Sequence, residues 1–147
     1  MVQSTLKWGF ETHSEKIKSL IGSISNISIE VYQQVCKKFL PLPKKSHYLF
    51  NFRDLMRVLQ GIISVPANKY NSMEDNRQKL LNLWVHECLR VYSDRLVDKS
   101  DKLIFSSLLE DVIKNQYNIE MNEICKPDQT LMYGNFMDAH ALNKVYC

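Results

Sequence analysis

The sequence contains little glycine and little proline, with four of each among 147 residues, which excludes a turn-rich or low-complexity chain. It has no apolar run near the roughly 20 residues that a membrane helix needs, and its first residues lack the apolar core of a secretory signal. The net charge of +3 comes from basic residues scattered among acidic ones. We therefore expect neither a membrane nor a nucleic acid as a partner.

The sequence also lacks the spacings that bind metal ions or form disulfide frameworks. No two cysteines form a C-x-x-C pair, so reduced thiols in an intracellular protein are expected. The His86–Glu87 pair would need a second histidine at position 90 to complete a zinc motif, and Arg90 stands there. No metal site is predicted. The four cysteines are Cys36, Cys88, Cys125 and Cys147.

A phosphate-binding loop is missing as well. The sequence has no G-x-x-x-x-G-K-[ST] motif, and no apolar run ends in a pair of acidic residues that would hold magnesium. An ATPase of the P-loop type needs both features. The isolated chain is therefore predicted not to hydrolyse ATP.

What the sequence does contain is helical periodicity. Apolar residues at helical spacing predict helices near residues 15–40, 53–64, 74–97 and 101–116, which would form a small all-α bundle with an irregular C-terminal tail. Since Gly22 lies inside the first range, that range is either one long helix or two helices in line. Pro41 and Pro43 end it.

Each predicted helix has an apolar face that should form the core. The expected core residues are Ile17, Leu20, Ile21, Ile24, Ile27, Val31, Val35 and Phe39; Leu55, Leu59, Ile62 and Ile63; Leu80, Leu81, Trp84, Val85, Cys88, Leu89, Tyr92 and Leu96; and Phe105, Leu108, Leu109, Val112 and Ile113.

The stretch with the clearest functional content is SHYLFNFRDLMRVLQG, residues 46–61. A short extended lead at residues 47–50 precedes Asn51, which can cap a helix, and Asp54 follows in the first turn, where an acid is favoured. Arg53 lies in the same turn, on the side opposite the apolar stripe. Its guanidinium could offer paired donors to a phosphate, although an arginine at such a position is usually only solvated.

The remaining charged residues have simpler explanations. We expect Asn51 to be a cap rather than a ligand and the Lys44–Lys45 pair to lie in a solvated turn. Arg90 could pair with Asp94 on the outer side of its helix. The Asp94, Arg95 and Asp98 cluster is expected to be surface charge.

Four ordered motifs resemble the helical lid subdomain of a dynein heavy-chain AAA+ module, and specifically the third module of axonemal members. These motifs are FLPLPKKSH, N-x-R-D-L ending in Q-G, LWVHECLRVYSDRLVD and LMYGNF. The chain departs from the family pattern at Leu42, Lys44 and Asn135. The resemblance covers roughly residues 10–146.

This resemblance implies several expectations. Residues 1–13 would be an irregular leading segment, 14–118 the lid and 119–147 an extended linker toward the fourth module. Arg53 would be the sensor-2 residue beside the cap Asn51, near ATP or ADP with Mg²⁺ bound by the intact module, and no catalytic residue is expected in this chain.

The resemblance further implies a fragment of a motor that moves along microtubules. Its partners would be the large AAA+ subdomain and neighbouring modules of the heavy chain, with microtubules and the light and intermediate chains engaged through the intact motor. The expected location is the cytoplasm and cytoskeleton, in the axoneme of a cilium or flagellum. The alternative is a free-standing helical interaction module with no nucleotide role.

Overall fold

The computed structural model describes residues 15–65 and 76–117, with side chains from residue 22 in the first range and residue 78 in the second. These ranges form four α-helices, and the part of the chain described contains no β-strand, which confirms the predicted all-α fold. The elements are α2 (Glu15–Lys38), α3 (Phe52–Ile63), α4 (Asn76–Val91), the 3-10 helix η2 (Ser93–Arg95) and α5 (Lys99–Tyr117).

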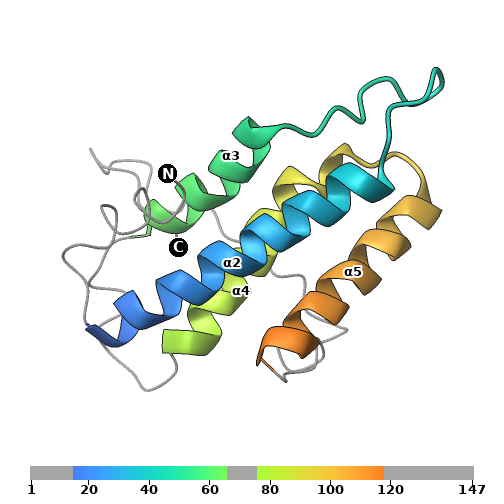
Figure 1. The fold of residues 1–147 in the computed structure, drawn as a ribbon. Coiled ribbons are helices and arrows are strands. Elements are labelled where there is room, and N and C mark those ends of the chain that lie inside the picture. The colour runs from blue at the N-terminus through green and yellow to red at the C-terminus, as the bar shows by residue number, and fades with distance from the viewer. Residues whose placement is uncertain (1–14, 66–75, 118–147) are drawn as a thin grey trace, which may run out of the picture.

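The helices pack as a bundle in which α2 and α4 are central. Helix α3 packs mainly on α4, and α5 packs mainly on α2, while α2 also contacts α3 and α4. Figure 1 shows α2 crossing the front of the bundle, with α3 on one side and α5 on the other. The loop from α2 to α3 lies near the connection between α4 and α5 (Figure 1).

The core is apolar and includes one buried polar pair. The indole Nε1–H of Trp84 donates a hydrogen bond to the Ser28 hydroxyl at 2.8 Å, and that hydroxyl donates to the Ile24 carbonyl at 2.6 Å. Trp84 is fully buried, so its N–H needs this partner. The predicted core residues that the structure shows buried are Ile24, Ile27, Val31, Val35, Phe39, Leu55, Leu59, Ile62, Leu80, Leu81, Trp84, Val85, Cys88, Tyr92, Leu96, Phe105, Leu108, Leu109, Val112 and Ile113.

The predicted helix positions agree with the structure to within a few residues, except for the end of α4. Residues 15–38 form one continuous helix through Gly22, which decides between the two alternatives for this segment. Ile63 and Leu89 are only partly buried, and Val58, which was not predicted as core, is fully buried.

The prediction that the third helix extends to residue 97 is wrong. Helix α4 ends at Val91, a 3-10 turn follows, and Leu96 has extended backbone angles of φ −78° and ψ 126°. Apolar spacing continues through Tyr92 and Leu96, both buried, so the pattern does not mark the end of the helix. The turn is stabilised by hydrogen bonds from Arg95 to Asp54 of α3 and to the Leu49 carbonyl.

Some predictions fall on residues outside the described ranges. These are the leading segment 1–13 and the linker 119–147, so the division of the chain into three parts stays a prediction. For the predicted core positions Ile17, Leu20 and Ile21, the structure describes the backbone but not the side chains. In the described ranges no helix is both long enough and apolar enough to cross a membrane.

Candidate functional site at the start of helix α3

Helix α3 begins with a complete capping box. Asn51 has extended backbone angles (φ −133°, ψ 173°), and its side-chain Oδ1 accepts a hydrogen bond from the Arg53 backbone N–H at 2.9 Å. The Asn51 backbone N–H donates in return to Oδ2 of Asp54 at 3.0 Å. This reciprocal arrangement satisfies backbone donors that would otherwise have no partner in the first turn. The Asn51 side chain therefore serves as the helix cap.

The Asp54 carboxylate is buried, with 2% of the residue exposed. Arg95, which lies in η2, holds it with two hydrogen bonds: Nη1 donates to Oδ2 at 3.1 Å, and Nη2 donates to Oδ1 at 3.2 Å. A buried carboxylate is costly unless it is paired, and the planar guanidinium provides the bidentate geometry that best offsets the cost. Arg57, on the next turn, adds a longer ion pair of 3.7 Å.

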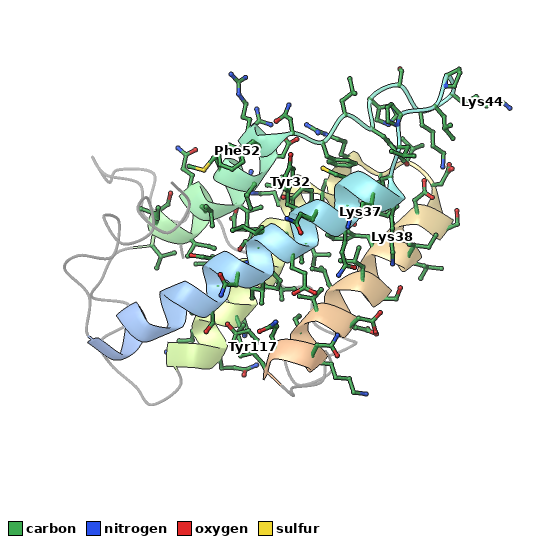
Figure 2. All side chains as sticks on the ribbon, in the orientation of Figure 1. Tyr32, Lys37, Lys38, Lys44, Phe52 and Tyr117 are labelled. Atoms are coloured by element: carbon green, nitrogen blue, oxygen red, sulfur yellow. The ribbon has the colours of Figure 1, made fainter. Side chains whose placement is uncertain are left out.

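The Arg53 side chain is exposed and forms no hydrogen bond or ion pair with the part of the chain that the structure describes. Its neighbour Phe52 is also exposed, at 42%. Figure 2 shows Phe52 at the end of α3 where the loop from α2 arrives. Arg53 therefore presents a positive charge to solvent from a helix start whose backbone is fixed.

The loop that leads into α3 is itself bound to the start of α5. Lys45 Nζ forms ion pairs with Asp98 at 2.6 Å and with Asp101 at 2.5 Å. The Tyr48 hydroxyl donates to Asp101 Oδ2 at 2.9 Å and accepts from the Val97 N–H at 3.1 Å. This network links the loop before α3 to the chain between α4 and α5.

The structure corrects two predictions about charged residues. Arg95 and Asp98 are not simply surface charges, since each pairs with a residue more than 40 positions away. Lys45 is likewise not merely solvated, whereas Lys44 is exposed and lies at the outer part of the loop (Figure 2). Sequence spacing on one helix does not reveal such partners, although Asp54 and Arg95 both belong to motifs singled out in the sequence.

Arg90 was predicted to pair with Asp94, but it pairs with a second buried acid, Glu87. Arg90 instead donates to Oε2 of Glu87 from Nε at 3.0 Å and from Nη2 at 2.5 Å. The Glu87 side chain is fully buried. Glu87, which the sequence placed in half of a zinc motif, lies against Gly61 of α3. No metal-binding cluster of three or more His, Cys, Asp or Glu side chains occurs in the described ranges.

The donor set at the start of α3 fits one contact to an anionic oxygen, not a whole nucleotide site. It consists of the Arg53 guanidinium beside the positive end of a helix dipole. In the described ranges no group of three or more His, Cys, Asp or Glu side chains could hold a metal ion, and the sequence has no phosphate-binding loop motif. Such groups would have to come from elsewhere.

Comparisons with known proteins identify the family. Residues 2–102 match the family described as "Dynein heavy chain, ATPase lid domain". The chain is 36% identical to mouse dynein axonemal heavy chain 2 over 123 residues, which are 84% of this chain and 3% of that protein. It is 41% identical to human dynein axonemal heavy chain 1 over 119 residues, 81% of this chain and 3% of that protein.

A third relative is the Chlamydomonas reinhardtii dynein-1-beta heavy chain of the flagellar inner arm I1 complex, 35% identical over 128 residues, which are 82% of this chain and 3% of that protein. The fold and these matches together define the helical lid of an ATPase module. The chain belongs to the dynein heavy chain family, in its ATPase lid domain. It spans about 3% of the length of these relatives.

Proposed function

We propose that this chain is the lid of a regulatory ATPase module, the third in the ring of an axonemal dynein heavy chain, and that Arg53 is its phosphate-sensing residue. The observation that carries the proposal is the exposed guanidinium of Arg53 on the first turn of α3, without a partner among the described residues. Family membership favours this function over a free-standing interaction module.

Within such a module the Arg53 side chain would donate hydrogen bonds to a phosphate oxygen of ATP held by the large subdomain. A charge-assisted hydrogen bond of this kind contributes ~1.5–3 kcal/mol. ATP, bound together with Mg²⁺ by the intact module, would be the molecule whose phosphate bond is hydrolysed. The lid supplies a charge whose position depends on how its helices rotate against the large subdomain.

The proposed context follows from the relatives' names. Dynein axonemal heavy chains and a flagellar inner-arm heavy chain are among them. We place the intact protein in the axoneme, within the cytoskeleton of a cilium or flagellum, where it would move along microtubules. The large subdomain and neighbouring modules of the same heavy chain would be its direct partners, and the motor's light and intermediate chains would be indirect ones.

The test is Arg53→Ala in a heavy chain that contains this lid. We expect ATP binding or hydrolysis at that module to fall by roughly 10- to 150-fold, because each ~1.4 kcal/mol is a factor of ten. The thermal stability of the lid should hardly change, since the Arg53 side chain is exposed. Nucleotide-binding titrations and stopped-flow release from microtubules measure the effect.

Leu59→Ala is the control for loss of folded protein. Leu59 is fully buried on the inner face of α3, so its truncation should cost ~2–5 kcal/mol of folding stability. If both variants reduce motility only in proportion to lost folded protein, Arg53 is a surface arginine and the proposed role is wrong.

A further inference from the structure

Arg95 holds the start of α3 from outside the helix. Besides its two hydrogen bonds to Asp54, Arg95 Nη1 donates to the backbone carbonyl of Leu49 at 3.0 Å. Its guanidinium carbon also lies 5.3 Å from the centre of the Phe50 ring, a cation–π distance. Arg95 therefore contacts the chain on both sides of the cap residue Asn51.

These contacts surround the backbone of Arg53. Leu49 and Phe50 precede the cap, and Asp54 follows Arg53 directly in the chain. Asp54 Oδ2 accepts both the Asn51 N–H and a hydrogen bond from Arg95 Nη1, so this one oxygen joins the cap to Arg95. The backbone on both sides of Arg53 is thus held by a residue 42 positions later in the sequence.

Arg95 itself is poorly placed to contact a ligand. Both of its terminal nitrogens already donate to Asp54, and Nη1 also donates to Leu49, so neither could turn to a phosphate without giving up a hydrogen bond to the buried Asp54 carboxylate. Its position in η2, between α4 and α5, makes it a link between those helices and the start of α3. These features describe a positioning residue.

We propose that the Asp54–Arg95 pair holds Arg53 in the orientation that engages phosphate, so that Arg95 is a positioning residue for nucleotide sensing. This inference rests on the proposed function of Arg53. A lysine at position 95 would keep the positive charge but could not form the two parallel hydrogen bonds, because an ammonium carries its donors on one nitrogen rather than on a planar fork of two. The geometry of the guanidinium, and not only its charge, is therefore required.

The experiment is a double-mutant cycle in the full heavy chain carrying this lid, with ATP affinity of the module as the measurement. Arg95→Lys should lower that affinity about tenfold, at the lower end of the range expected for Arg53→Ala, because the Arg53 guanidinium is still present. Adding Arg95→Lys to Arg53→Ala should lower it no further, because Arg95 acts through Arg53. Hydrogen exchange in the segment from Leu49 to Asp54 should become faster in Arg95→Lys.

Arg90→Lys is the matched control. Arg90 also pairs with a buried carboxylate, that of Glu87, but Glu87 packs on α3 at Gly61, eight residues beyond Arg53. At a rise of 1.5 Å per residue, Gly61 lies about 12 Å from Arg53 along the helix axis. Arg90→Lys should leave ATP affinity and the hydrogen exchange of the first turn of α3 unchanged.

The outcomes separate this inference from the proposed function. If Arg53→Ala lowers ATP affinity but Arg95→Lys does not, or if the two effects add in the double variant, the positioning role is wrong while the sensing role of Arg53 stands. If Arg53→Ala leaves the affinity unchanged, the proposed function fails and the positioning role fails with it. Non-additive losses, with Arg90→Lys silent, support both.

Discussion

At the scale of single residues, the ion pairs of Asp101 control how the loop before α3 is held. The hydrogen bond from Lys45 lowers the pKa of the Asp101 carboxyl below its ordinary value of 3.8, and the Tyr48 hydroxyl lowers it further, against the opposing effect of burial. The same contact raises the pKa of Lys45, with Asp98 as its second partner. Asp101 therefore binds a proton less readily in the folded chain than in the unfolded one.

The first prediction from these residues concerns acid stability. Because the folded pKa of Asp101 is depressed, its contribution is complete above pH 3.8 and is lost as the pH falls through the folded value. Asp101→Asn should be less stable than the parent near neutral pH, and the difference should shrink on acidification. Urea unfolding followed across this pH range measures it. Asp111→Asn, exposed on the same helix, should track the parent, and a gap of constant size for Asp101→Asn would contradict the prediction.

The same residues show what sequence reasoning can identify. Asn51 and Asp54 could be assigned to the start of a helix, because a cap and a first-turn acid act on neighbouring backbone atoms. Arg95 could not be matched with Asp54, because the pair forms only when η2 folds against the start of α3, 41 residues away. Burial of an acid is decided by such tertiary contacts, which apolar periodicity does not record.

At the scale of secondary structure, the contact between α3 and α4 depends on the absence of a side chain at Gly61. A Cβ added there would lie 2.1 Å from Cδ and 2.2 Å from Oε2 of Glu87. Glu87 is fully buried, and Arg90 holds its carboxylate. The buried acid therefore occupies the space that a larger residue at position 61 would need.

The prediction is that Gly61→Ala destabilises the chain, although alanine is the better helix former by ~1 kcal/mol. Displacing Glu87 should cost ~1–3 kcal/mol, the usual range for overpacking. Gly22→Ala is the matched control within α2: nothing lies within 4 Å of a Cβ there, so that change should stabilise the chain by ~0.5–1 kcal/mol. Denaturant unfolding of both variants measures the two changes in unfolding free energy. Equal stabilisation by both would mean that Glu87 moves aside freely.

Helix positions were predictable because packed helices repeat apolar residues every three or four positions. That rule located α2, α3 and α5 within a few residues. It failed at the end of α4 because Tyr92 and Leu96 remain buried after the helix has ended. An apolar pattern indicates which residues are buried, and Tyr92 and Leu96 are buried on either side of η2, although η2 itself contains no buried residue.

At the scale of the whole molecule, exposed apolar side chains concentrate in two segments that meet. Residues 40–52 and 97–104 contain all of the large hydrophobic residues that are exposed in the described chain, and the Lys45–Asp101 and Tyr48–Asp101 contacts bring these segments together. The exposed residues are Leu40, Leu42, Leu49, Phe52, Val97, Leu103 and Ile104. Such a concentration is typical of a surface that another protein segment covers.

The last prediction is that the isolated 147-residue chain self-associates through this surface and binds a hydrophobic dye. Val97 and Leu103 are 68% and 72% exposed, so replacing both with serine should reduce association and dye fluorescence while leaving the unfolding temperature nearly unchanged. Sedimentation velocity over a series of concentrations measures the association. Leu108→Ser is the control for general unfolding: Leu108 is fully buried, and its replacement should lower stability and increase dye binding. A parent chain that stays monomeric and binds no dye would show that these side chains do not form a surface for self-association.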